Sequence, residues 1–289
     1  MATGISRILF SALLIGVILT LPLPAARAVA PATVQISGAA FVITWLPACA
    51  TPPAEAITAL ETAAALWGTW ISSPVPIAVS ACWTPDPSGG DALATGIPAE
   101  YITNFPGAPL VNVNYPIALA NALSGADLHP GAVDMRLQFK SDIAWSYTTK
   151  MHATAGEDFI AVALHELAHG LGFVGNMVES SNIGFCGDGP YGALYPCPTP
   201  YDWFAMDSTG VPLLDYRTPD PRELGARLKS DASFGGANVI TAYGSPLKLY
   251  TPATWMWGSS LSHLDQSTFG GGSNRLMTPS YSGVTRHPG

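Results

Sequence analysis

The sequence predicts an α+β fold, in which a twisted sheet and a site-bearing helix form the N-terminal half and an irregular, loop-rich lobe follows. Before residue 175, apolar residues recur at helical spacing in some segments and alternate at strand spacing in others. From residue 176 to 259, glycine, proline, asparagine and serine are dense, and no long periodic segment occurs. The chain has 29 glycines and 26 prolines but only 11% charged residues, a composition that suits a loop-rich extracellular domain.

The N-terminus has the features of a secretory signal peptide. Arg7 precedes an apolar run at residues 8–21, and small residues follow up to Ala30. A membrane span needs about 20 apolar residues, so this run is too short, and no later segment is long and apolar enough. We therefore expect residues 1–28 to be removed, with cleavage after Ala28 or Ala30. The mature protein would be secreted or periplasmic, without a stable membrane anchor.

The charge of the chain excludes one class of partner. Its formal net charge is −8, and cleavage would remove Arg7 and Arg27 but no acidic residue. Nucleic-acid-binding proteins carry clustered basic residues, which this chain lacks. We therefore expect no nucleic-acid partner.

A helix and a strand are predicted first. Residues 53–71 read as a helix, because Ile57, Leu60 and Ala64 recur at three-and-four spacing and Pro53 stands near the start. Residues 76–83 are predicted to form a strand. We predict nothing regular just beyond it, because residues 84–90 are rich in proline, serine and glycine.

Residues 133–140 alternate between apolar and polar side chains. Met135, Leu137 and Phe139 fall on one face, and Arg136 and Gln138 on the other. This pattern predicts a half-buried strand, which we place at an edge of the sheet. An edge strand that borders a cleft could pair with an extended peptide.

The site-bearing helix should span residues 157–171. Glu157 and Asp158 favour its positive N-terminal end, and Gly170 and Gly172 end it. Apolar residues at helical spacing, such as Phe159, supply its packing face.

This helix carries His165-Glu166-Leu167-Ala168-His169, an HExxH pattern. Histidines four residues apart lie on one helix face with roughly 6 Å between their Cβ atoms, a separation that two ligands of a tetrahedral zinc need. Glu166 is then placed to take a proton from water as a general base. The plainer interpretation is an ordinary amphipathic helix that happens to carry these residues.

A catalytic zinc usually has three protein ligands and a water, so a third ligand is needed. The extended metzincin pattern HExxHxxGxxH has Gly172 in place here, but Gly175 occupies the position of the third histidine. The other histidines are His129, His152, His263 and His287.

Two downstream motifs carry a family resemblance. Ser262-His263-Leu264-Asp265 is followed by Leu276-Met277-Thr278-Pro279. Together with HExxHxxG, this order resembles the leishmanolysin-like metzincins, in which a long insertion separates the glycine from a histidine in a Ser-His context and a Met-turn follows. The resemblance covers roughly residues 53–281.

The resemblance implies a zincin/metzincin-like fold and a zinc-dependent endopeptidase of protein or peptide substrates. It implies His165, His169 and His263 as zinc ligands, Glu166 as catalytic base, and Met277 as the Met-turn residue beneath the metal. It also implies an N-terminal catalytic lobe at residues 29–175 and a C-terminal lobe, residues 176–289, with the third ligand and the Met-turn.

Several alternatives remain open. His287 or a carboxylate such as Asp202 could replace His263, as in zincins with a carboxylate third ligand. Tyr281 is a candidate for stabilising the oxyanion, although a tyrosine there is more often structural. Metzincins continue into a further helix beyond the Met-turn, whereas this sequence ends at Gly289. This favours a rival interpretation, an exported adhesin or binding module with a structural or vestigial zinc site.

The four cysteines, an even number in an exported chain, predict two disulfides. Pairing of Cys186 with Cys197 closes a short loop and leaves Cys49 with Cys82, and we favour this connectivity over the two others. An alternative role for Cys49 is a thiolate that blocks zinc in a latent form. Calcium suits loop-rich exported proteins, but no EF-hand ligand run supports it.

Overall fold

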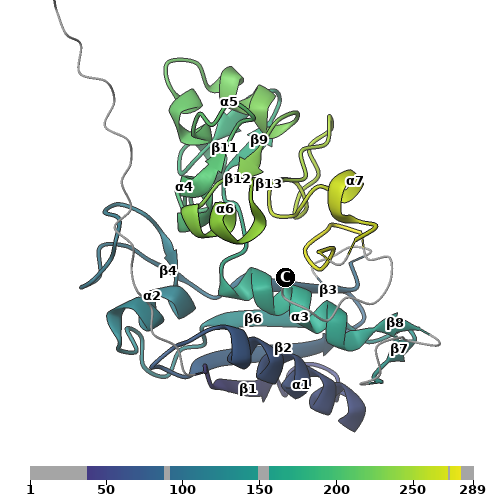
Figure 1. The fold of residues 1–289 in the computed structure, drawn as a ribbon. Helices are drawn as coiled ribbons and strands as arrows, with labels where there is room; N and C mark the ends of the chain where they lie inside the picture. Colours follow the sequence, from purple (N-terminus) through teal and green to yellow (C-terminus); the bar gives the residue numbers. More distant parts are fainter. Residues whose placement is uncertain (1–37, 88–91, 149–155, 273, 281–289) are drawn as a thin grey trace, which may run out of the picture. The chain divides into compact units, whose positions relative to one another are not determined.

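The computed structural model describes residues 38–87, 92–148, 156–272 and 274–280 (Figure 1). The fold is α+β, as predicted. The expected signal peptide, residues 1–28, lies outside the described residues, as do His152, Tyr281 and His287. No helix in the described part of the chain combines the length and apolar character that a membrane crossing requires.

A four-stranded sheet is the base of the fold, with the strand order β1-β2-β6-β3. β1 (Phe41–Trp45), β2 (Ile77–Thr84) and β6 (Met135–Lys140) are parallel, and β3 (Ala94–Pro98) pairs antiparallel with β6 at one edge.

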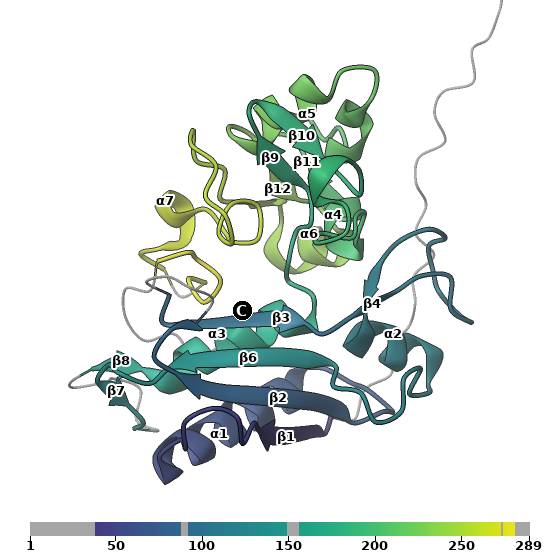
Figure 2. The same cartoon turned by 180° about the vertical axis from the view of Figure 1, so that it is seen from behind.

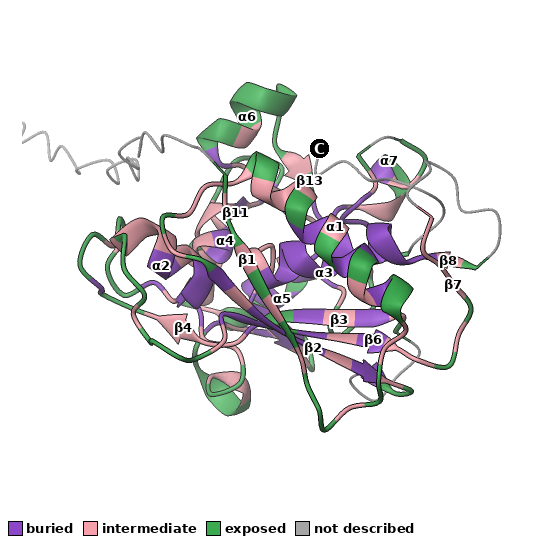
Figure 3. Ribbon diagram, turned by 90° about the horizontal axis from the view of Figure 1, so that it is seen from below, coloured by how far each residue is buried: buried purple, intermediate pink, exposed green. Residues whose placement is uncertain are grey.

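Two helices, α1 (Ala54–Trp70) and α3 (Phe159–Leu171), lie on one face of this sheet (Figure 2). Buried and exposed residues alternate along α1 (Figure 3), because only one of its faces meets the core. Between α3 and β6, the rings of Phe159 and Phe139 pack with centroids 4.7 Å apart, and both side chains are fully buried.

The predicted elements agree with the structure to within two residues at their ends. Pro53 and Ile71 cap α1 at its two ends. α3 begins at Phe159 rather than Glu157, because the Asp158 side chain accepts a hydrogen bond from the Ala161 N–H and so serves as N-cap. Glu157 and Asp158 also form a short strand, β8 (Glu157–Asp158), parallel to β7 (Trp145–Ser146).

The prediction of an edge strand at residues 133–140 is wrong in its position within the sheet. These residues form β6, which is half-buried as predicted but pairs with β2 on one side and β3 on the other. The two edges belong to β1 and β3, and the β3 sequence Ala-Thr-Gly-Ile-Pro has few strand-favouring residues. Gly96 in this strand instead permits a close approach by α3.

The connection between β3 and β6 and the chain after α3 consist of short elements. The first region holds β4 (Tyr101–Ile102), β5 (Tyr115–Pro116) and α2 (Ile117–Ser124). The later elements are β9 (Val178–Ser180), β10 (Ile183–Phe185), η2 (Gly189–Tyr191), α4 (Pro200–Phe204), β11 (Ala205–Met206), η3 (Leu213–Arg217), α5 (Pro221–Leu228), β12 (Ser233–Phe234), α6 (Ala237–Tyr243), β13 (Leu247–Lys248) and α7 (Gln266–Phe269).

Buried polar contacts and disulfides hold these short elements in place. The fully buried carboxylate of Asp202 accepts hydrogen bonds from the backbone N–H groups of Asn176 and Met177 and from Thr199, and so joins the chain leaving α3 to α4. Disulfides join Cys49 to Cys82 and Cys186 to Cys197, which confirms the predicted connectivity. A free Cys49 thiolate is therefore excluded in this structure.

Candidate metal centre

Helix α3 supplies two imidazoles and a carboxylate to one buried site. Glu166 and His169 are each 7% exposed, and His165 is partly buried beside them. Gly172 ends the helix with φ 118°, a backbone conformation that favours glycine. The chain turns there, and the Phe173 carbonyl oxygen accepts a hydrogen bond from His169 Nδ1 at 2.7 Å.

The third imidazole, His263, comes from a loop between β13 and α7. Its backbone is held on both sides, because the Tyr250 N–H donates to the His263 carbonyl oxygen and the Leu264 N–H donates to that of Met277, each at 2.8 Å. The preceding Ser262 hydroxyl accepts a hydrogen bond from the Gly175 N–H at 3.1 Å and donates to the Gly175 carbonyl oxygen at 3.3 Å.

Gly175 therefore has a packing role at the position where the short metzincin motif places its histidine. A Cβ atom at residue 175 would lie 2.7 Å from the Leu261 side chain. The glycine makes room for the loop at residues 261–263, and this loop delivers His263 to the site.

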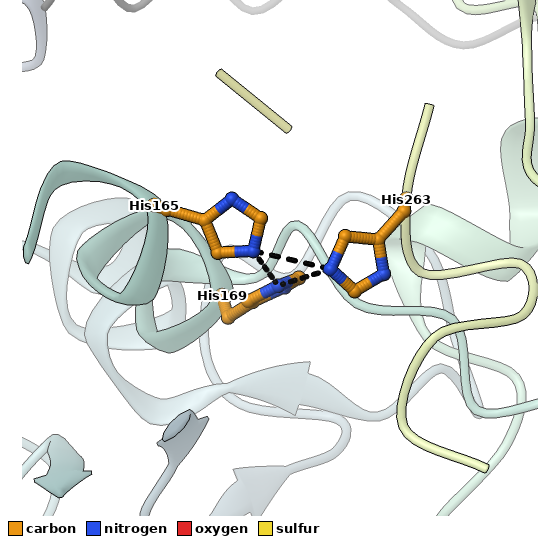
Figure 4. Close-up of side chains that lie close together, drawn as sticks. All are labelled: His165, His169 and His263. Carbon is orange, nitrogen blue, oxygen red and sulfur yellow. Dashed lines mark hydrogen bonds between the residues drawn. The ribbon is translucent and has the colours of Figure 1, made fainter. Parts of the chain in front are cut away.

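The three Nε2 atoms converge on one point (Figure 4). The His165–His169, His165–His263 and His169–His263 separations between Nε2 atoms are 3.0, 3.1 and 3.3 Å. Two nitrogens bound to a tetrahedral zinc at 2.0–2.1 Å would lie about 3.3 Å apart. The triad therefore has the size of a metal site.

Each imidazole is oriented by its other nitrogen. His165, His169 and His263 place Nδ1 at 2.6, 2.7 and 2.9 Å from the carbonyl oxygens of Leu276, Phe173 and Ser259, respectively. A carbonyl accepts but cannot donate, so each Nδ1 carries the proton and each neutral Nε2 has a free lone pair.

Burial lowers the pKa of all three imidazoles, that of His263 to about 3, so they are neutral at ordinary pH. Three lone pairs at this separation repel each other unless a cation lies between them. The residues present therefore fit a metal ion, and the three-histidine group could bind one.

Glu166 lies beside this triad and is also buried. Burial raises the pKa of its carboxyl group to about 8, against a hydrogen bond from the Gly96 backbone that lowers the pKa. A Cβ at Gly96 would lie 2.2 Å from the Glu166 carbonyl oxygen, so β3 and α3 approach to backbone contact here.

An open cleft of about 770 Å³ contains the triad and Glu166. The edge strand β3 borders it with Ala94, Thr95, Gly96 and Ile97. Trp255 and Trp257, from the chain just before His263, also line it. The cleft therefore gives a ligand access to the triad alongside β3, an edge strand of the described sheet.

The structure brings together His165, Glu166, His169 and His263, all of which the sequence singled out. The alternative ligand Asp202 lies outside the triad, and its carboxylate accepts hydrogen bonds from backbone N–H groups and from Thr199. His129 is exposed and pairs with Glu100. Met277 is buried at 6% exposure in the core, and its backbone carbonyl supports Leu264 next to His263.

Sequence reasoning missed the groups that hold the site together. The carbonyl groups of Leu276, Phe173 and Ser259 carry no residue-type signal, because any residue could provide them. Gly96 was missed along with its strand. The two tryptophans in Trp255-Met256-Trp257 are a visible signal whose place in the cleft depends on the fold.

Comparisons of this chain with protein-family models, with curated proteins and with solved structures gave no match.

Proposed function

We propose that this protein is a secreted, zinc-dependent endopeptidase, related in mechanism to the leishmanolysin-like metzincins that its motifs resemble. The observation that carries the proposal is the convergence of three neutral Nε2 atoms beside a buried glutamate in an open cleft. A structural metal site needs neither the glutamate nor the access, because it is closed by four protein ligands.

Zinc suits this donor set better than the other common metals. Three imidazoles in roughly tetrahedral spacing, with a position left for a small ligand, are typical of catalytic zinc. Calcium and magnesium prefer oxygen ligands, and the triad offers nitrogen alone. When bound, zinc supplies Lewis acidity and lowers the pKa of water toward 7.

Glu166 performs the proton transfers in this proposal. Its carboxylate accepts a proton from the attacking water and then delivers it to the departing amine nitrogen. Burial favours the protonated form of Glu166, whereas a cation bound at the triad would favour the carboxylate, so Glu166 is poised to change its protonation state during the reaction.

The substrate in this proposal is an extended peptide on the edge of β3. β3 is an edge strand of the described sheet, and an extended peptide that pairs with such a strand is held by its main chain independently of its side chains. Two disulfides are compatible with an extracellular location, where such an enzyme would meet protein substrates.

The test compares wild type with Glu166→Gln, with zinc content and cleavage of casein measured on both. We expect about one zinc per chain in both proteins, and loss of cleavage by about 10²–10⁴-fold in the variant. Zinc-loaded wild type that leaves casein intact would point to the alternative, an exported binding module with a structural or vestigial zinc site. A wild type that binds no zinc would end both interpretations.

A further inference from the structure

Four aromatic side chains form a cluster next to the triad, which we call the aromatic wall: Tyr191, Tyr195, Trp255 and Trp257. The Trp257 ring centroid lies 5.2 Å from that of Tyr191, 6.0 Å from that of Tyr195 and 6.2 Å from that of Trp255. Trp257 is therefore the centre of the cluster.

The wall is built from two fixed segments. Tyr191 and Tyr195 lie within the loop that the Cys186–Cys197 disulfide closes. The tryptophan segment is held to the third histidine, because the Met256 N–H donates to Ser260 Oγ, the Ser260 N–H donates to the Met256 carbonyl oxygen, and Ser259 orients the His263 ring. The wall thus has a fixed place relative to His263.

The wall faces the cleft and is not sealed into the core. Tyr195, Trp255 and Trp257 line the cleft, and Trp257 is 50% exposed. Ile97 of the edge strand β3, 53% exposed, also lines the cleft. Exposed apolar surface of this kind is costly in water and marks a binding site when it is contiguous with a cleft.

The charges of the residues that line the cleft indicate which ligand side chains it can bind. The described lining residues include Glu157 and Glu166 but no lysine or arginine, so an acidic side chain finds no partner there. We propose that the aromatic wall is a specificity subsite for a large apolar side chain, aromatic or long aliphatic, close to the bond that is cleaved. This inference rests on the proposed peptidase function and names its substrate class.

The test measures binding separately from turnover. Zinc-loaded Glu166→Gln protein is titrated calorimetrically with acetyl-Ala-Ala-Phe-Ala-Ala-amide and with the all-alanine peptide. We expect the Phe peptide to bind about 10-fold tighter or more, because a buried phenyl ring replaces a methyl group. Adding Trp257→Ala should abolish the difference, whereas Trp257→Phe should keep most of it.

The control is Trp70→Ala, which removes a comparably exposed tryptophan from the end of α1 and should preserve the preference. Equal affinities for the two peptides, no measurable binding of the Phe peptide, or a preference that survives Trp257→Ala would each overturn the inference. If the Phe peptide binds more tightly but wild type does not cleave casein, the peptidase proposal is wrong and the subsite stands. If wild type cleaves casein but the two peptides bind equally, the subsite is wrong and the peptidase proposal stands.

Discussion

Each imidazole of the triad is oriented by a single backbone carbonyl, and that contact decides which nitrogen faces the cleft. Without the Leu276 carbonyl, for example, the His165 ring could present either nitrogen. The residue pattern HExxH therefore specifies which side chains meet, and the backbone around them specifies how. This division explains why His165, Glu166 and His169 could be predicted by sequence spacing while their supports could not.

Gly96 is the residue outside the triad at which a small change should have the largest effect on the site. In Gly96→Ala, the added Cβ would meet the Glu166 backbone, with its carbonyl oxygen 2.2 Å away and its Cα 2.9 Å away. A helix backbone cannot yield as a side chain can, so α3 must move away from β3. We expect a loss of about 1–3 kcal/mol in the free energy of unfolding, measured with urea, and reduced proteolytic activity.

Gly271→Ala is the matched control, because a Cβ at Gly271 meets nothing within 4 Å. It should leave both stability and activity close to wild type. If Gly96→Ala behaved like Gly271→Ala, the contact between β3 and α3 would not position Glu166.

At the scale of elements, periodicity predicted α1, β2, β6 and α3 well, because each buries one face against the same core. It failed for β3, whose five residues include a glycine and a proline. β3 is stabilised by pairing with β6 and by close packing of Gly96 against α3. Both contacts depend on the tertiary structure, so the local sequence does not predict them. The elements after α3 are too short to have a periodic pattern.

Asp207, the residue after β11, makes part of the later chain sensitive to acid. Burial raises the pKa of its carboxyl group, but hydrogen bonds from Tyr216, Thr209 and Val211 outweigh it and hold the pKa well below the ordinary value of 3.8. The folded form thus keeps Asp207 ionised at a pH where the unfolded chain takes up a proton. Its stabilising effect is complete above about pH 5 and is lost progressively as the pH falls further.

Asp207→Asn should therefore be destabilising at neutral pH, by about 1–3 kcal/mol, because the Tyr216 hydroxyl loses a charged acceptor. The difference from wild type should narrow as the pH is lowered from 5 to 3. Urea unfolding across this range measures it, with the exposed Asp142→Asn as control. A difference that stayed constant with pH would contradict the ionised state of Asp207.

At the scale of the whole molecule, the triad joins parts of the chain that are far apart in sequence. His263 lies 94 residues after His169, and the carbonyl that orients His165 lies 111 residues after it. No periodicity extends over such a distance, and His263 was singled out by a family resemblance in Ser262-His263. The structure explains why a serine precedes His263, because the Ser262 hydroxyl bonds both the backbone N–H and the carbonyl of Gly175 and so fixes the loop that carries His263.

A metal ion at the triad would cross-link α3 to the chain around His263, so its removal should destabilise the whole fold. At a zinc concentration about 1,000 times the dissociation constant, binding contributes about 4 kcal/mol to the free energy of unfolding. For a chain of this size, this corresponds to a fall in Tm on the order of 10 °C on chelation.

His263→Ala should lower the Tm of the zinc-loaded protein and make it nearly insensitive to the chelator. His129→Ala, which removes an exposed histidine, should retain the wild-type response. Differential scanning calorimetry with zinc and with EDTA measures the change in Tm. Equal changes for wild type and His263→Ala would show that the metal binds elsewhere.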